Sequence, residues 1–514
     1  MLTNSNDGAT RGGAARAGLV VALAAFVVLA TANAAMYRYG VSDQAFYIPV
    51  VARALDPAAF PRDAALIDAQ GRLMLADEVL ATLVRTTGAT LESLFLGGYL
   101  LSLVLIFAGL VLIGRRLYTN PWTTLALVTA FTMRHHITRT SANTFEGYFH
   151  PRMLAFGVGL LAVAAFVHRR HWLAVVLTVA AAAVHNTTGL WFAVLIGAAI
   201  VVLEPAWGRV GVPAAVAGVA VAAWALLAGP LHGRLVVMDS LWLQAVASKD
   251  SLFATEWPLS AWAINLGTLG VLWVAHRWRA AHGRAGAEER ALAWGATALV
   301  ALFIVTLPAV AARVAFPVQL QISRVFWLVD VVATVCLIGA IADWPRLARL
   351  GRPALAMCLA ALAAGRGAYI LFVEYPERPL FQTRLQASPW HEAMQWLATQ
   401  PQDIHVLADS GHAWRYGSSV RVSAGRDVFL EETKDSAIAI YSRDVAVRVV
   451  DRTGALGDLS TRGTADVLRL GERYGLTHVV TTGRLDLPLV FENSGFRVYA
   501  LPAPVRFAGA VPDR

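Results

Sequence analysis

A carboxylate stands close after the first long apolar run, in the stretch YRYGVSDQAFYIPVVARALDPAAFPRD at residues 37–63. Asp43 in this stretch is followed by Gln44 and Tyr47. A carboxylate in such a loop can accept the proton of an acceptor hydroxyl, or hold a divalent cation beside a phosphate. The alternative is an N-cap for a helix over residues 44–55, because an Asp side chain accepts a hydrogen bond from the first N–H groups of a helix.

A second group of polar side chains lies in RHHITRTSANTFEGYFHPR, residues 134–152. From it we single out Glu146, His150 and Arg152 as candidate site residues. Arginines in one short loop favour an anionic partner such as a phosphate, because the guanidinium binds phosphate oxygens in bidentate geometry. The spacing of the three histidines matches no closed zinc site, and simple solvation of these side chains is the alternative.

A third group lies in AARVAFPVQLQISRVFWLVD, residues 311–330. Its polar members are Arg313, Gln319, Gln321, Arg324 and Asp330. Ionisable side chains at membrane depth are functional candidates by default. We expect Arg313 and Arg324 to bind a lipid phosphate, and the alternative for Arg324 is an ion pair with Asp330.

His185, followed by Asn186, ends another apolar segment. Its side chain is a candidate for the same substrate cavity. The alternative is a buried histidine that is hydrogen-bonded to a neighbouring backbone group.

The composition of the 514-residue chain is that of a membrane protein, with 57% hydrophobic and 15% charged residues. Soluble domains carry about 25% charged residues. The net charge of +9 does not indicate a nucleic-acid partner, because the arginines cluster between apolar segments. Cys336 and Cys358 both lie in apolar runs, so a cysteine-based metal site or disulfide framework is excluded. P-loop, GxGxxG, HExxH and GxSxG signatures are also absent from the sequence.

Apolar runs that can cross a membrane recur along residues 17–373. A spanning helix needs about 20 apolar residues. We expect about eleven helices, three of them short, in the following segments: Ala17–Met36, Leu91–Ile113, Pro121–Met133, Met153–Val167, Trp172–Val184, Thr188–Leu203, Val210–Ala228, Leu259–Ala275, Ala291–Ala312, Val325–Ile341 and Ala354–Val373.

The first of these segments resembles a cleavable signal peptide, with Arg11, Arg16 and the Ala32-Asn33-Ala34 sequence at its ends. Because its apolar run is longer than a usual signal core, we favour a retained membrane anchor.

Charge between the apolar runs is asymmetric and predicts the topology, because cytoplasmic loops carry an excess of Lys and Arg. If the N-terminus lies in the cytoplasm, the short arginine-rich loops also lie in the cytoplasm. This orientation predicts a cytoplasmic tail at residues 1–16, a transmembrane domain at 17–373 and an extracytoplasmic domain at 374–514. The extracytoplasmic loops of the transmembrane domain are expected at residues 37–90, 134–152 and 230–257.

From Ser388 onward the sequence reads as a soluble α/β domain of about 120 residues. HEAMQWLATQ and TADVLRLGERYG have helical spacing, and Gly475 is expected to close the second helix. DIHVLAD, VRVSA, RDVFLE, THVVTTG and FRVYAL predict short strands. The expected fold is therefore mainly α, a polytopic helical membrane protein with a small C-terminal α/β domain outside the membrane.

This layout resembles the GT-C superfamily of polytopic membrane glycosyltransferases. SDQAFYIP at residues 42–49 is similar to the acidic motif that follows the first membrane helix in that family, with Gln44 in place of its second acidic residue. Glu146 in FEGYFHPR occupies the place of an acidic residue in the next outer loop. The segment YFHPRMLAFGVGLLAVAAF, the later VHNTTGLWF and the C-terminal RYGLTHVVTTG and LPLVFENSGFRVYAL resemble an uncharacterised bacterial branch of the family.

The resemblance implies transfer of a sugar from a polyprenyl-phosphate donor at the outer face of the membrane. Asp43 would be the catalytic base and Glu146 its companion. Gln44, Tyr47, His150, Arg152, His185, Arg313 and Arg324 are the predicted substrate-binding residues. A divalent cation, Mg²⁺ or Mn²⁺, is compatible with the family, but the missing second carboxylate separates this chain from members with an acidic pair.

The expected partners are the lipid-linked donor, the lipid bilayer and a glycan, lipid or protein acceptor, without nucleic acid. The expected location is the inner membrane of a bacterial cell envelope, with the N-terminus in the cytoplasm and the C-terminal domain outside. Two other functions stay open at the level of sequence. One is a transporter or flippase of a lipid-linked or anionic substrate, and the other is a non-catalytic scaffold with the same layout.

Overall fold

The computed structural model describes residues 6–71, 75–349 and 351–502. They fall into two compact units, and each unit combines separate parts of the chain. The helical unit is formed by Met1–Tyr37, Phe95–Val237 and Asp250–Gln382. The sheet unit is formed by Arg38–Leu94, Met238–Lys249 and Thr383–Arg514. Residues 1–5 of the predicted cytoplasmic tail lie outside the described residues, and the predicted assignment of segments to the two sides of a membrane stays a prediction.

All eleven expected apolar segments are helical. Their helices in chain order are α1 (Asn6–Asn33), α5 (Leu91–Leu117), α6 (Pro121–Thr132), α7 (Pro151–Val167), α8 (His171–Val184), α9 (Asn186–Leu203), α10 (Gly208–Leu227), α12 (Leu259–Ala281), α13 (Ala287–Ala311), α15 (Val325–Asp343) and α17 (Arg352–Tyr369). Within the described residues eight helices are long and apolar enough to cross a membrane, and α7 and α8 are shorter apolar helices. The chain is therefore a multi-pass helical membrane protein, as expected.

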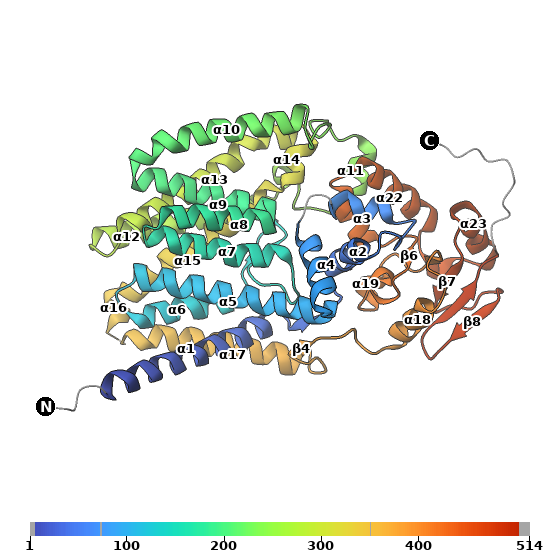
Figure 1. Cartoon of the computed structure of the whole chain (residues 1–514), viewed down its shortest axis with the longest axis horizontal. Coiled ribbons are helices and arrows are strands. Elements are labelled where there is room, and N and C mark those ends of the chain that lie inside the picture. The colour runs from blue at the N-terminus through green and yellow to red at the C-terminus, as the bar shows by residue number, and fades with distance from the viewer. Residues whose placement is uncertain (1–5, 72–74, 350, 503–514) are drawn as a thin grey trace. The chain divides into compact units, whose positions relative to one another are not determined.

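Shorter elements complete the helical unit. They are α14 (Ala315–Leu320), α16 (Pro345–Ala348), the hairpin of β2 (His136–Ile137) and β3 (Ala142–Asn143), three 3₁₀ turns (Pro205–Trp207, Ala254–Glu256 and Ile322–Arg324), and a π-helical turn over Ile370–Glu374 that continues α17. Figure 1 shows the long helices α5, α7, α8, α9 and α10 running largely alongside one another.

Small residues let the membrane helices approach closely. A Cβ at Gly109 of α5 would stand 2.8 Å from Leu160 of α7, and one at Gly295 of α13 would clash with the backbone oxygen of Leu195 of α9. Helix association in lipid depends on such close packing, because lipid tails are as apolar as the side chains.

Helix α1 is an integral part of the helical unit. The ring of Phe26 lies 5.5 Å from that of Phe107 on α5, and the Asn33 amide donates to the backbone oxygen of Ala363 on α17 at 3.1 Å. Retention of this segment as a membrane anchor stays a prediction.

Arginines of the predicted cytoplasmic loops meet acidic residues at one end of the helical unit. Arg116 and Arg169 both donate to the Glu288 carboxylate, at 2.9 and 2.8 Å. Arg169 follows the C-terminal end of α7, whereas Arg152 stands in its first turn. A 17-residue helix is about 26 Å long, so these two arginines mark opposite ends of the bundle.

The sheet unit contains a five-stranded sheet in the order β6-β5-β7-β9-β8. Its strands are β5 (His405–Leu407), β6 (Asp427–Val428), β7 (His478–Thr481), β8 (Leu489–Glu492) and β9 (Arg497–Ala500). β5 pairs in parallel with β6 and β7, and β9 pairs antiparallel with β7 and β8. Two apolar clusters, one around Trp390 and Val406 and the other around Leu407 and Val479, form its core. The predicted α/β character of the C-terminal region is confirmed.

The helices of the sheet unit come from three parts of the chain. They are α2 (Gln44–Leu55), α3 (Ala64–Gly71), α4 (Ala76–Thr87), α11 (Ser240–Ala245), α18 (Pro389–Ala398), α19 (His412–Arg415), α20 (Val420–Ser423), α21 (Glu432–Ala439), α22 (Arg443–Leu456) and α23 (Thr464–Tyr474), with a 3₁₀ turn at Leu459–Thr461. Gly475 ends α23 in the left-handed conformation, at φ 63°, as predicted.

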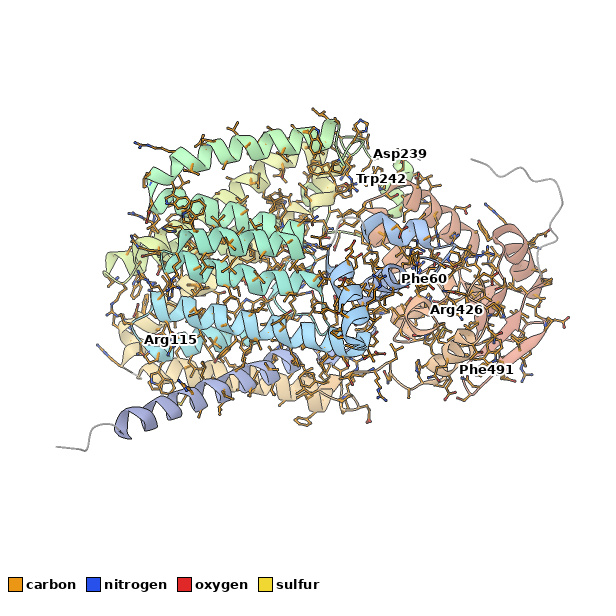
Figure 2. All side chains as sticks on the ribbon, in the orientation of Figure 1. Phe60, Arg115, Asp239, Trp242, Arg426 and Phe491 are labelled. Carbon is orange, nitrogen blue, oxygen red and sulfur yellow. The ribbon has the colours of Figure 1, made fainter. Side chains whose placement is uncertain are left out.

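Hydrogen bonds tie the early segments into the sheet unit. The Trp242 indole of α11 donates to the backbone oxygen of Ala439 on α21 at 2.7 Å, and the Asp239 side chain caps α11 (Figure 2). The backbone N–H groups of Arg62 and Asp63 donate to the two carboxylate oxygens of Asp427, each at 3.0 Å. The segment around Asp63, which follows α2, is thus held by the C-terminal fold.

One strand prediction is wrong. VRVSA forms the short helix α20 instead of a strand. The Ser419 side chain accepts from the N–H of Arg421 and starts the turn. The turn directs the Arg421 side chain into the unit, where its side chain is only 2% exposed among carboxylates.

Candidate active site

Glu146 and Arg152 form a buried ion pair in the helical unit. The Arg152 guanidinium lies 3.0 Å from the Glu146 carboxylate, and their side chains are 5% and 8% exposed. The Asn143 amide donates to the same carboxylate oxygen at 3.2 Å. Gly147 fixes the position of this loop, because a Cβ there would clash with the backbone oxygens of Ala34 and Met36. Two of the candidate residues of the 134–152 loop, Glu146 and Arg152, therefore contact each other in the fold.

His150 and His185 cap two helices that begin at this site. The Nδ1 atom of His150 accepts from the N–H of Arg152 at 3.0 Å, at the start of α7. The Nδ1 atom of His185 accepts from the N–H of Thr188 at 3.3 Å, at the start of α9. The two rings lie 6.0 Å apart. Because Nδ1 accepts in both residues, the neutral form of each ring carries its hydrogen on Nε2 and offers a donor there.

Positive groups surround His185. Burial lowers the pKa of His185 well below its usual range, and charges on His150, Arg152 and Arg324 lower it further. His185 is therefore neutral at pH 7. We call His150, Arg152, His185 and Arg324, with the carboxylate of Glu146, the cationic cluster. The alternative prediction for His185, a hydrogen bond to a neighbouring backbone group, is met by its bond from the Thr188 N–H. The charged side chains around His185 also make it part of the cluster.

Arg324 does not pair with Asp330, the alternative that the sequence left open. The Asp330 carboxylate lies 2.7 Å from Nδ1 of His135, and Nε2 of His135 lies 3.2 Å from the backbone oxygen of Ala130. Both ring nitrogens therefore face acceptors. Burial lowers the pKa of His135, but the hydrogen bond to Asp330 and the charge of that carboxylate raise it, and the net shift is upward.

Arg313 belongs to a different set of contacts. Its guanidinium pairs with Glu256 and lies 4.1 Å from the ring centre of Phe253. Gln319 accepts from Arg234 at 2.8 Å. These contacts do not link Arg313 to the cationic cluster, so its predicted phosphate-binding role stays a prediction without support from the described contacts.

Asp43 lies in the sheet unit directly before α2. Its side chain makes no capping hydrogen bond, so capping does not account for the carboxylate. Its Oδ1 atom instead lies 2.6 Å from Nζ of Lys434 on α21, and the Asp43 side chain is 36% exposed. A partly exposed carboxylate beside a cation is available for proton transfer.

Gln44 and Tyr47 support the conformation of the Asp43 loop. The Gln44 side chain is fully buried, and its oxygen accepts from the N–H of Gly40 at 2.7 Å. Gly40 has φ 79°, which favours glycine at this turn. Tyr47 is buried with its ring 5.3 Å from that of Phe46. Their predicted contacts with substrate are untested.

A buried charge network in the sheet unit was not predicted from the sequence. Arg421 donates to Asp63 at 2.7 Å and to both carboxylate oxygens of Asp435 at 2.6 and 3.2 Å. Arg448 pairs with the other oxygen of Asp63. We call Asp63, Arg421, Asp435 and Arg448 the buried charge network. Its members stand far apart in the sequence and lack any common spacing, so a single sequence contains no signal that would join them.

The carboxylates of the described residues do not fit a divalent cation. Among these residues no group of three or more His, Cys, Asp or Glu side chains could hold a metal ion. Asp43 is paired with Lys434 and Glu146 with Arg152, so each carboxylate already faces a cation. The Mg²⁺ or Mn²⁺ site stays a prediction, and no step below depends on a metal.

The comparisons with known proteins include matches among the solved structures. No family model matches the chain, and no curated protein matches it. The chain is similar to the apo form of the Archaeoglobus fulgidus oligosaccharyltransferase, at 13% sequence identity and a TM-score of 0.37. The match covers 90% of this chain and 69% of that chain.

Proposed function

We propose that this protein transfers a sugar from a polyprenyl-phosphate donor to an acceptor at the outer face of the membrane. The observation that carries the proposal is the cationic cluster, which gathers two arginines and two capping histidines at the ends of membrane helices. The acidic motif at residues 42–49 and its resemblance to GT-C glycosyltransferases add support.

The cluster suits a phosphate that is anchored in the bilayer. The isoprenoid tail of such a donor stays among the lipid chains, so its phosphate must lie at the interface where the membrane helices end. Helix N-termini and arginines both stabilise phosphate charge, and the Nε2–H groups of His150 and His185 supply further donors. Arg152 and Arg324 would stabilise the charge that builds on the departing lipid phosphate.

In this proposal Asp43 is the base. It takes the proton of the acceptor hydroxyl as the acceptor oxygen bonds to the anomeric carbon of the sugar. The bond from that carbon to the phosphate oxygen breaks, and the electron pair leaves with the polyprenyl phosphate. Glu146 acts through Arg152, whose guanidinium it holds in place.

The transporter alternative needs ionisable side chains along a path through the bilayer. Asp330 of α15, a carboxylate in a membrane helix, gives it little support, and its carboxylate contacts His135. The scaffold alternative predicts that the cationic cluster binds no lipid phosphate. We place the protein in the inner membrane of a bacterial cell, with its N-terminus inside and the sheet unit outside, as the arginine distribution predicts.

Binding of undecaprenyl phosphate to the purified protein tests the phosphate site without knowledge of the sugar. We expect Arg324→Ala to weaken binding about 10- to 100-fold, because a hydrogen bond to a charged group contributes about 1.5–3 kcal/mol. Arg324→Lys should lie between Arg324→Ala and the wild type, because it keeps the charge but loses bidentate geometry.

Arg284→Ala is the control, because Arg284 pairs with Asp343 at the opposite end of α15 from Arg324. It should bind undecaprenyl phosphate like the wild type. Native mass spectrometry measures all four proteins. Equal affinity of the wild type and both Arg324 variants would remove Arg324 from the proposed site.

A further inference from the structure

Lys434 contacts the carboxylate of Asp43, which is the base in the proposed function. Its Nζ atom lies 2.6 Å from Oδ1 of Asp43, and its side chain is 16% exposed. Asp43 does not use its side chain to cap α2, so this contact, rather than the helix, orients the carboxylate. An ammonium beside a carboxylate favours the ionised form of the carboxylate.

The buried charge network fixes the helix that carries Lys434. The next residue, Asp435, is bound by both terminal nitrogens of Arg421 and also accepts from the N–H of Glu431 at 3.1 Å. Arg421 in turn holds Asp63, from the loop that follows α2. The first turn of α21 and the loop that follows α2 are therefore joined through buried ion pairs, and Lys434 in that turn contacts Asp43.

Other charged groups of the sheet unit surround the pair. Lys249, which follows α11, lies within electrostatic reach of both Lys434 and Asp43, and its Nζ donates to the backbone oxygen of Thr433 at 2.9 Å. The Glu432 carboxylate accepts from the Ser410 hydroxyl at 3.1 Å. Lys249 adds to the positive potential at Asp43, whereas Glu432 opposes it.

Stability alone does not explain the pair. A partly exposed ion pair contributes about 0–1 kcal/mol. We propose that Lys434 is a positioning residue of the transfer reaction, which keeps Asp43 ionised and oriented and thereby sets the acidic limit of activity. This inference rests on the proposed function.

The test is the pH dependence of kcat/KM for sugar transfer, measured from undecaprenyl-phosphate monosaccharides in membranes that contain the full chain. In Lys434→Met the Asp43 carboxylate loses its cation, so the acidic limb of the profile should move upward by about one pH unit. Below the midpoint of that limb, kcat/KM should then be about tenfold lower than in the wild type. Lys434→Arg should restore the wild-type limb. Arg443→Met is the control, because Arg443 pairs with Asp239 on the surface of the same unit.

The outcomes separate the two proposals. If the wild type transfers sugar and its pH profile superposes on that of Lys434→Met, the role of Lys434 is overturned. The proposed function is then left intact. Absence of transfer by the wild type at every pH overturns the proposed function and this inference with it. A uniform loss in Lys434→Met at all pH values, without recovery in Lys434→Arg, assigns Lys434 a structural role and also overturns the inference.

Discussion

The two units hold charged side chains in opposite ways. In the sheet unit, the buried charge network matches two guanidiniums with two carboxylates through direct hydrogen bonds. In the helical unit, the cationic cluster brings the guanidiniums of Arg152 and Arg324 to the buried His185, and the Glu146 carboxylate pairs with Arg152. A balanced network holds a fold together, whereas an accumulation of positive groups at helix ends suits an anionic ligand.

The comparison separates structural charges from candidate binding charges by their contacts. Arginine content alone does not do so, because Arg421 and Arg324 look alike in the sequence. What distinguishes them is the number of carboxylates around each guanidinium and the helix termini beside it. The predictions below test this distinction.

The largest effect is expected where the balanced network is broken. Arg421→Met leaves the buried carboxylates of Asp63 and Asp435 without their shared cation. Removing one partner of a buried ion pair costs about 3–5 kcal/mol. Thermal and denaturant unfolding of the full chain in detergent should show this loss. Arg443→Met removes an exposed arginine and should cost less than about 1 kcal/mol, so equal losses in the two variants would contradict the distinction.

Glu146→Gln should reduce transfer more than it reduces stability. The amide keeps the shape of the side chain but no longer holds the charge of Arg152. We expect about a 10- to 100-fold loss of kcat/KM, which corresponds to about 1.4–2.7 kcal/mol of barrier. Glu256→Gln, next to Arg313, is the matched control and should keep wild-type activity. A loss of the same size in the control would show that any outer carboxylate matters equally.

The stability of the sheet unit should depend on pH through Glu431. Burial raises the pKa of Glu431 from 4.5 to about 7, even though Arg421 lowers it. The folded state therefore binds the proton more tightly than the unfolded state. The associated stability is fully present below about pH 4.5 and is lost as the pH rises through about 7.

The variant Glu431→Gln removes this titration. Stability measured from pH 4.5 to 7.5 should fall by on the order of 1–2 kcal/mol more in the wild type than in the variant. Parallel curves for the two proteins would show that Glu431 does not titrate in this range.

The smallest effect is expected from removal of divalent cations. Because Asp43 and Glu146 each face a cationic side chain, a chelator should change the transfer rate by less than about twofold. A rate that collapses with EDTA and returns with Mg²⁺ or Mn²⁺ would restore the metal that the family resemblance implies.

The membrane helices could be predicted from sequence because their signal is local. Each apolar run from Ala17 to Val373 carries its own length and composition, and the structure confirms each as a helix. Helix α23 with its Gly475 terminus was predictable for the same reason. The helix formed by VRVSA was not predictable. Arg421 in this segment binds the buried carboxylates of Asp63 and Asp435, and these contacts override the strand-like pattern.

The candidate site was only partly predictable. The fold brings together five of the residues that were singled out from the loop at residues 134–152, the segment around His185 and the segment 311–330: Glu146, His150, Arg152, His185 and Arg324. The sequence did not indicate that Asp330 pairs with His135, nor that Lys434 pairs with Asp43. Those pairings depend on segments 195 and 391 residues apart in the chain.

The most direct measurement is transfer of labelled sugar from undecaprenyl-phosphate monosaccharides by membranes that contain the wild type or Asp43→Asn. Loss of a general base costs about 10²- to 10⁴-fold in rate. We expect the wild type to transfer label and Asp43→Asn, inserted and folded to the same level, to lose at least 100-fold of that rate. Asp239→Asn, at a helix cap of the same unit, should transfer label normally. Wild-type transfer by Asp43→Asn would contradict the assignment of Asp43 as the base, and absence of transfer by the wild type would contradict the proposed function itself.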